Sequence, residues 1–198
     1  IMPETTLPRI VFMGTPTFSE VALRALHAAQ YPLVAVYTKP DKPSGRNQEI
    51  SKSPVKIFAE AQSIPVEQPP RFDDNAIATL RNYRPDIIVV AAYGKILPQA
   101  VLDIPKDGCI NIHASMLPRW RGASPIQNAL LSGDSTTGIT LIKMDAGMDT
   151  GPIITSKEMR IEPEETTGSL LPKLAEMGAK LLIDTLPHWR AGNKTPQE

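Results

Sequence analysis

The sequence is poor in cysteine, histidine and aromatic residues, and the shortage of cysteine excludes two kinds of site. Its 198 residues include a single cysteine, Cys109, which excludes an internal disulfide framework and a cysteine-based zinc site. We therefore expect a reducing, cytoplasmic setting. Acids and bases cancel, 21 against 21, so a polyanionic partner must be held by a local patch rather than by a global field. The longest apolar run, residues 87–93, is far shorter than the roughly 20 residues that span a bilayer, and no membrane association is expected.

The first predicted strand-to-helix turn lacks the glycines of a dinucleotide-binding fingerprint. That fingerprint uses three glycines to bring the backbone close to a pyrophosphate, and here only Gly14 is present. The sequence therefore argues against an NAD-dependent oxidoreductase, and we expect neither a nucleotide nor a metal cofactor. The turn either binds an anion at the helix N-terminus or is simply a tight connection.

Strand and helix patterns alternate along the chain and predict a doubly wound, mostly parallel α/β domain of Rossmann-like architecture. The predicted strands cover residues 9–14, 33–37, 64–66, 86–92, 108–114, 137–143 and 152–161. The predicted helices begin at 15–17, 54, 73, 124 and 166. A polar loop occupies residues 39–53. We expect one catalytic domain over residues 1–186 and a linker over residues 187–198, because the tail is polar and contains proline and glycine.

Asn111 and His113 form a polar pair on a strand that is otherwise apolar. Alternate side chains of a strand share a face, so this amide and this imidazole should project side by side while Ile110 and Ile112 face the other way. Such a pair at a strand end can hydrogen-bond a developing oxyanion, and the imidazole can move a proton near neutral pH. The alternative is a hydrogen-bonded structural histidine beside a structural amide.

A second polar segment, residues 143–152, alternates two aspartates, Asp145 and Asp149, with two glycines between predicted strands. Such a loop suits close approach to a ligand, and Asp149 could support a charged imidazole while holding a water that carries protons. Taken alone, Asp-Gly pairs are also ordinary turn chemistry. His113 is the obvious acid or base, because His27 and His188 lie in helical, surface-like contexts.

Together with residues 115–127, which contain a Leu-Pro-x-x-x-Gly core, these segments resemble the formyltransferase fold family. The order and the spacing match, and the likeness extends from about residue 9 to residue 192. The resemblance implies a catalytic triad of Asn111, His113 and Asp149 and a formyl donor, 10-formyltetrahydrofolate. It also implies folate contacts from two loops and the segment after the histidine: Tyr93, Gly94, Ile96, Leu97, Ser115, Leu117, Pro118, Asp145, Ala146 and Gly147.

The loop after the second predicted strand is similar to that of family members that formylate the α-amine of methionyl initiator tRNA. Residues 39–56 carry five bases and two acids, as expected of an element that follows phosphates. The resemblance implies tRNA contacts from Lys39, Lys42, Arg46, Arg119 and Arg121. For the two arginines that flank Trp120, solvation beside a packed indole is an equal alternative.

Several alternative functions also fit the sequence. A sister enzyme that formylates a sugar or ribonucleotide amine would differ only in its acceptor, and a non-catalytic RNA-binding module would use residues 39–56 alone. The resembling tRNA enzymes carry a β-barrel domain after the linker, so we expect chemistry without that domain but weaker tRNA binding. No obligate protein partner is evident.

Overall fold

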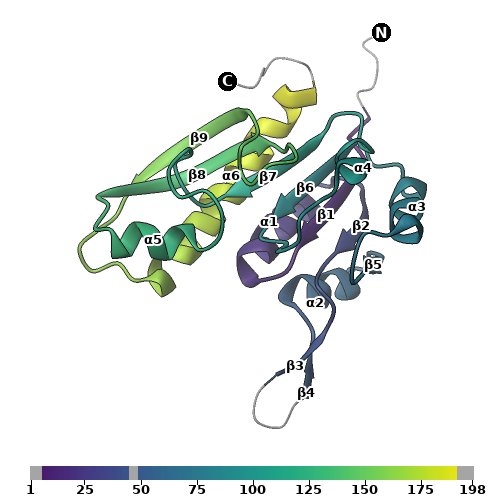
Figure 1. The fold of residues 1–198 in the computed structure, drawn as a ribbon, viewed down its shortest axis with the longest axis horizontal. Helices are drawn as coiled ribbons and strands as arrows, with labels where there is room; N and C mark the ends of the chain where they lie inside the picture. The colour runs from purple at the N-terminus through teal and green to yellow at the C-terminus, as the bar shows by residue number, and fades with distance from the viewer. Residues whose placement is uncertain (1–5, 45–48, 191–198) are drawn as a thin grey trace.

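A seven-stranded sheet forms the centre of the computed structural model, which describes residues 6–44 and 49–190 (Figure 1). The strand order is β5-β2-β1-β6-β7-β8-β9. The bounds are β1 Ile10–Gly14, β2 Leu33–Tyr37, β5 Val66–Glu67, β6 Ile87–Ala91, β7 Cys109–His113, β8 Thr136–Lys143 and β9 Ile153–Arg160. The strands from β5 to β7 pair in parallel, whereas β8 and β9 are antiparallel additions. The predicted mostly parallel sheet is confirmed.

Helices cover both faces of the sheet, as a doubly wound fold requires. On one face α1, α2, α5 and α6 pack against the larger apolar cluster, and on the other α3 and α4 pack against the smaller one. Their bounds are α1 Thr17–Ala28, α2 Pro54–Ala61, α3 Asp74–Asn82, α4 Gln99–Leu102, α5 Pro125–Leu131 and α6 Thr167–Arg190. Within the described ranges, none of these helices is both long and apolar enough to cross a membrane.

Strand β1 shows why the central strands consist of unbroken runs of apolar residues. Its five residues are all buried, with Ile10 and Phe12 in the larger cluster and Val11 and Met13 in the smaller one. At its end, a Cβ on Gly14 would lie 2.6 Å from Ser19 Cβ and 2.7 Å from the Ala91 carbonyl oxygen. The glycine is therefore required by the close packing of β1, α1 and β6.

The order of the strands also locates a binding crevice. From β1 the chain proceeds outward to β2 and β5, then returns past β1 to β6 and β7 on the other side. The carboxyl ends of β1 and β6 thus flank a topological switch point, where open α/β sheets bind their ligands.

The predicted loop at residues 39–53 contains a hairpin of β3 (Lys42–Ser44) and β4 (Glu49–Ser51), which projects from the body of the protein (Figure 1). The prediction missed these strands because they are three residues each and form no part of the apolar core. Helix α4 was missed because it is only four residues long, although Val101 and Leu102 belong to the smaller apolar cluster.

The boundary predicted between residues 186 and 187 stays a prediction, although α6 continues through Pro187 to Arg190 and so ends later than the helix that the sequence predicted. The extra turn is held from outside the helix, since the Trp189 indole Nε1 donates to the Asp107 carbonyl at 2.9 Å. The rest of the predicted linker, residues 191–198, lies outside the described residues.

Candidate active site

Strand β7 presents Asn111 and His113 on one face, as the alternation predicted. Ile110 and Ile112 enter the larger apolar cluster on the opposite face. Asn111 is half-buried, and His113 is 6% exposed. The face that carries the pair borders a cavity, so the two polar side chains meet solvent or a ligand on that side alone.

The loop between β8 and β9 brings the third polar group to this face. Because β8 runs antiparallel to β7, its last residue, Lys143, pairs with Ile110 near the start of β7. The following residues then fold back over the sheet. At Gly151 a Cβ would lie 1.8 Å from the Lys143 carbonyl oxygen, so this return needs a glycine. Asp149 itself adopts a left-handed conformation with φ of 52°, which turns its carboxylate inward.

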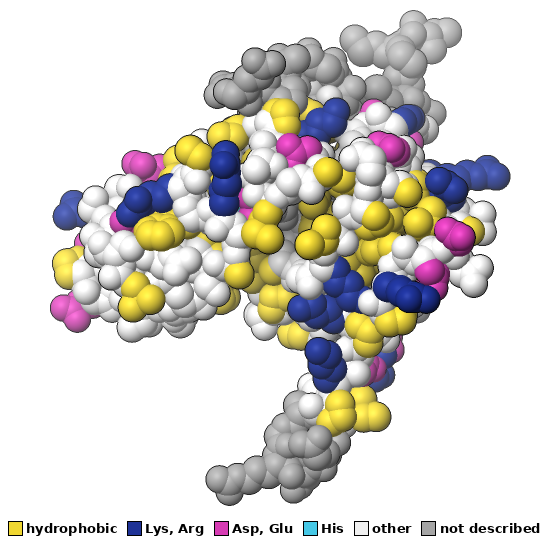
Figure 2. All heavy atoms as spheres, in the orientation of Figure 1, with side chains coloured by type: hydrophobic (Ala, Val, Ile, Leu, Met, Phe, Trp, Pro, Cys, Tyr) yellow, Lys and Arg dark blue, Asp and Glu magenta, His cyan; other side chains and the backbone are white. Residues whose placement is uncertain are grey.

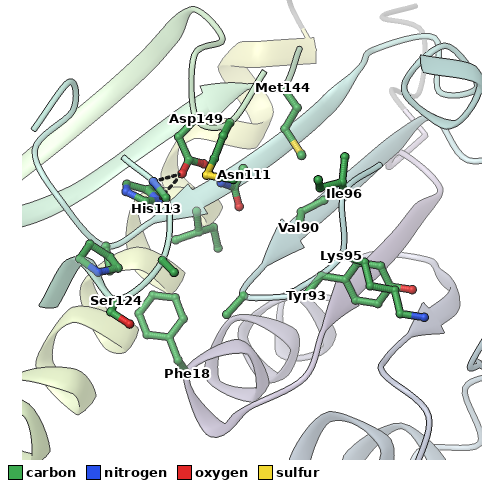
Figure 3. Close-up of a pocket in the computed structure, with 18 of the residues that line it drawn as sticks. Phe18, Val90, Tyr93, Lys95, Ile96, Asn111, His113, Ser124, Met144 and Asp149 are labelled. Atoms are coloured by element: carbon green, nitrogen blue, oxygen red, sulfur yellow. Dashed lines mark hydrogen bonds and ion pairs between the residues drawn. The ribbon is translucent and has the colours of Figure 1, made fainter. Parts of the chain in front are cut away.

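The Asp149 carboxylate brings the three predicted catalytic residues together, by a hydrogen bond from Asn111 and an ion-pair contact with His113 (Figure 3). The Asn111 amide Nδ2 donates to Asp149 Oδ1 at 3.1 Å. The backbone N–H of Gly122 donates to Asp149 Oδ2 at 2.8 Å, and His113 Nδ1 lies 3.5 Å from the same oxygen. Residues far apart in sequence therefore converge as predicted. The arrangement can stabilise negative charge through the amide and the imidazole, and can accept a proton at the carboxylate.

The imidazole is oriented by a second contact on its opposite side. His113 Nε2 lies 2.8 Å from the carbonyl oxygen of Trp120. A carbonyl oxygen only accepts hydrogen bonds, so Nε2 must carry a proton. Nδ1 is then the nitrogen that faces Asp149 and whose protonation can change during a reaction.

A cavity of about 560 Å³ lies beside this group. Of the predicted folate contacts, seven line it: Tyr93, Gly94, Ile96, Leu97, Asp145, Ala146 and Gly147. The other three, Ser115, Leu117 and Pro118, are not among its lining residues. Ser115 Oγ donates to the Arg119 carbonyl at 2.6 Å and Leu117 N donates to Thr140 Oγ1 at 3.1 Å. Ser115 and Leu117 thus stabilise the loop that follows β7, and the three folate contacts stay predictions.

The cavity has two ends that the sequence did not distinguish. Figure 3 shows Phe18 and Ser124 on one side of the polar group, and Val90, Ile96 and Met144 on the other. Further lining residues that the sequence did not indicate are Pro16, Gly122, Ala123, Pro125, Ile126, Gln127 and Leu171. Their position in the sequence could have indicated them, because many of them follow the carboxyl end of β1 or β6 or lie in the turns after His113.

Lysines gather near the base of the hairpin, where Figure 2 shows several basic side chains together. Burial lowers the pKa of Lys95, and the nearby charges of Lys39 and Lys42 lower it further. Lys56 and Lys52, by contrast, are paired with Asp41 and Glu60. Predicted tRNA contacts Lys39 and Lys42 therefore belong to a local cationic group. Arg46, also predicted, lies outside the described residues.

The arginines beside Trp120 differ from each other. Arg119 lies 4.4 Å above the Trp120 ring and donates to Asp134 Oδ2 and Oδ1, at 2.9 and 2.6 Å. A phosphate would have to compete with this bidentate pair, so the structure gives Arg119 an internal partner instead. Arg121 is exposed and its role stays a prediction.

Two further features bear on cofactors. Among residues 6–44 and 49–190, no group of three or more His, Cys, Asp or Glu side chains is arranged to hold a metal ion.

Tyr93, which lines the cavity, is 1% exposed, and its burial raises the pKa of the phenol to about 12. The phenol therefore stays neutral and adds no charge to the cavity at neutral pH.

Comparison with known proteins places this geometry in a family. Residues 8–186 match the formyl transferase family. Methionyl-tRNA formyltransferase of Xylella fastidiosa is 54% identical over 185 residues, and that of Stenotrophomonas maltophilia is 53% identical over 187. These matches cover 93 and 94% of this chain and 60 and 61% of the relatives, so the chain spans about 60% of their length.

A solved structure, phosphoribosylglycinamide formyltransferase from Bacillus halodurans, has the same fold, with a TM-score of 0.76 and 25% identity. The alignment covers 90% of this chain and 93% of that one. The family match runs through every strand of the sheet and includes all three residues of the polar group. On this evidence, the chain belongs to the formyl transferase family.

Proposed function

We propose that the protein transfers a formyl group from 10-formyltetrahydrofolate to the α-amine of methionyl initiator tRNA, in the cytoplasm. The observation that carries this proposal is the Asn111–His113–Asp149 group at the edge of a cavity, in a chain more than half identical to methionyl-tRNA formyltransferases. The group offers two donors for an oxyanion and one acceptor for a proton.

The donor occupies the end of the cavity bounded by residues 93–97 and 144–149. Two large apolar side chains are exposed there, Ile96 at 80% and Met148 at 63%, and apolar surface at a cavity mouth favours contact with the face of a flat ring system. The folate ring packs between these loops, which directs its formyl group toward Asn111.

In the reaction, the neutral amine attacks the formyl carbon and a C–N bond forms. Negative charge develops on the former carbonyl oxygen, which accepts hydrogen bonds from the second N–H of Asn111 and from the Nδ1–H of the charged His113 imidazole, which the Asp149 carboxylate supports. Because donors fixed in advance stabilise the tetrahedral intermediate without reorganisation, this contact lowers the barrier. Asp149 takes the proton of the amine through a water. The bond from carbon to N10 of the folate then breaks, and the proton passes to N10.

The acceptor enters from the opposite end of the cavity. Phe18 lies at that end, and the apolar lining of the cavity, which also includes Ile126 and Leu171, surrounds the methionyl side chain. The phosphates of the tRNA acceptor end lie toward Lys39, Lys42 and the hairpin, because neither lysine forms an ion pair with a carboxylate within residues 6–44 and 49–190, unlike Lys52 and Lys56.

The test is a competition among amines. The chain is incubated with 10-formyltetrahydrofolate and equal concentrations of methionyl initiator tRNA, glycinamide ribonucleotide and an amino sugar nucleotide, and the products are identified by mass. Formyl-methionyl-tRNA as the main product supports the proposal. A formylated ribonucleotide or sugar would assign the chain to a sister reaction, and tRNA binding without consumption of formyl-folate would indicate an RNA-binding module.

A further inference from the structure

The loop between β7 and α5 supports two of the three catalytic groups through its backbone. The carbonyl of Trp120 accepts from His113 Nε2 at 2.8 Å, and the N–H of Gly122 donates to Asp149 Oδ2 at 2.8 Å. Both contacts depend on where residues 119–122 lie. The position of this loop therefore decides which imidazole nitrogen faces the cavity.

The loop conformation at Trp120 requires an anchor. Trp120 has a φ of 59°, in the left-handed region that bulky residues rarely adopt without surrounding support. Its indole Nε1 donates to Asp134 Oδ2 at 2.7 Å, and Arg119 stacks on the ring while it forms a bidentate pair with the same carboxylate. One carboxylate thus fixes both side chains that flank the turn.

Asp134 itself lies in the turn between α5 and β8 and is not one of the lining residues of the cavity. Its backbone N–H donates to the Ala129 carbonyl at 3.0 Å, which ties it to the end of α5. Hydrogen bonds from Arg119, and then from Trp120, hold the pKa of the Asp134 carboxyl at about 2. The carboxylate is therefore charged and available to both donors at any pH at which the enzyme would work.

From these contacts we propose that Asp134 is a positioning residue for the reaction. Asp134 fixes the Trp120 ring by its hydrogen bond, and the fixed ring keeps the Trp120 carbonyl in place. The carbonyl in turn accepts from His113 Nε2, so this nitrogen keeps its proton. Nδ1 is then the nitrogen that faces the reacting atoms. The effect on rate rests on the proposed function, whereas the effect on the imidazole does not.

The imidazole is the direct readout. The chain contains three histidines, so long-range ¹H–¹⁵N NMR spectra resolve each ring and report which nitrogen is protonated. We expect the neutral His113 ring of the wild-type protein to be protonated at Nε2. In Asp134→Ala we expect a mixture of the two tautomers, since the carbonyl is released. Asp134→Asn retains an oxygen that can accept from Trp120, and should keep most of the Nε2–H form.

The rate supplies the second readout. For Asp134→Ala, loss of a fixed donor geometry should lower kcat by about 10- to 100-fold while the KM for formyl-folate changes less than about twofold, since the cavity lining is intact. Asp134→Asn should lie between this variant and wild type. An inactive wild-type chain would refute the proposed function, and the tautomer measurement would still decide the positioning role.

A matched control separates positioning from general loss of an ion pair. Glu20 pairs with Arg24 at 2.6 Å with its side chain 17% exposed, close to the 2.6 Å and 14% of Asp134 with Arg119. Glu20→Ala should leave the His113 ring signals and kcat unchanged. If Asp134→Ala behaves in the same way, the proposal is wrong.

A milder variant covers the case in which Asp134→Ala does not fold. Trp120→Phe replaces the indole by a smaller phenyl ring without the N–H, keeps an aromatic ring for Arg119, and should shift His113 partly toward the other tautomer. Wild-type ring signals and wild-type kcat in folded Trp120→Phe would also contradict the proposal.

Discussion

The polar group on β7 and the lysines at the base of the hairpin are both functional candidates, but they are built in opposite ways. Asn111, His113 and Asp149 are linked by contacts of 2.8 to 3.5 Å that involve backbone as well as side chains. Lys39 and Lys42 contribute charge on long side chains, one half-buried and one exposed. The first region acts through fixed geometry, and the second acts through an electric field.

This difference predicts different responses to mutation. A group that acts by geometry loses most of its effect when one member is removed, because the remaining members no longer meet the reacting atoms together. A field is a sum of charges, so each lysine contributes a small and salt-dependent share.

The largest effect is expected from His113→Ala. The variant removes a donor to the oxyanion and the exchangeable Nδ1 proton, so kcat for formyl transfer should fall by about a thousandfold or more. Single-turnover transfer to methionyl initiator tRNA measures it. Circular dichroism should show a folded protein, and His188→Ala, at an exposed site on α6, serves as the control. A decrease in kcat of less than tenfold would show that the polar group does not act through fixed geometry.

Asn111→Ala should have the next largest effect. Loss of one oxyanion donor costs about a hundredfold in kcat, and the variant also deprives Asp149 Oδ1 of its 3.1 Å contact. Because Asn111 acts on the intermediate, kcat should fall much more than the affinity for formyl-folate, which fluorescence titration measures. A variant that changes only the affinity would make Asn111 a binding residue.

Replacement of both Lys39 and Lys42 by alanine should act on affinity instead. We expect about tenfold weaker binding of initiator tRNA at low salt, and a slope of log affinity against log salt that is smaller by about one for each lysine that contacts a phosphate. Filter binding over a salt series measures both. Lys52→Ala is the matched control, because Lys52 already pairs with Glu60 at 2.7 Å. An unchanged slope would show that these lysines contact no phosphate.

The smallest effect is expected from Ser53→Ala, where the hairpin returns to α2. Ser53 Oγ caps the helix by accepting from Lys56 N at 3.1 Å, and it also lies 2.7 Å from Thr38 Oγ1. Loss of such a cap costs about 1 kcal/mol of folding free energy, which corresponds to a decrease in Tm of about 2–4 °C. The exposed Ser51 provides a control by Ser51→Ala. A decrease in kcat at saturating substrate would show that the hairpin base also orients the reacting groups.

The polar group could be predicted because its signals are local. Alternation in a strand determines that Asn111 and His113 share a face, and two Asp-Gly pairs mark a loop of unusual backbone shape. The contacts predicted for Arg119 and for Ser115, Leu117 and Pro118 stay predictions. Their sequence position beside the histidine suggested ligand contacts, whereas the tertiary structure gives Arg119 and Leu117 the long-range partners Asp134 and Thr140.

The amino-acid sequence by itself determined the order of the sheet's seven strands and of the longer helices, the apolar core and the polar face of β7, because each follows from short-range periodicity. Only the tertiary structure decided that β8 runs antiparallel to β7, so that the next loop folds back and places Asp149 against Asn111 and His113. It also decided which nitrogen of His113 is held by the Trp120 carbonyl. These outcomes depend on contacts between residues distant in sequence, which no local pattern encodes.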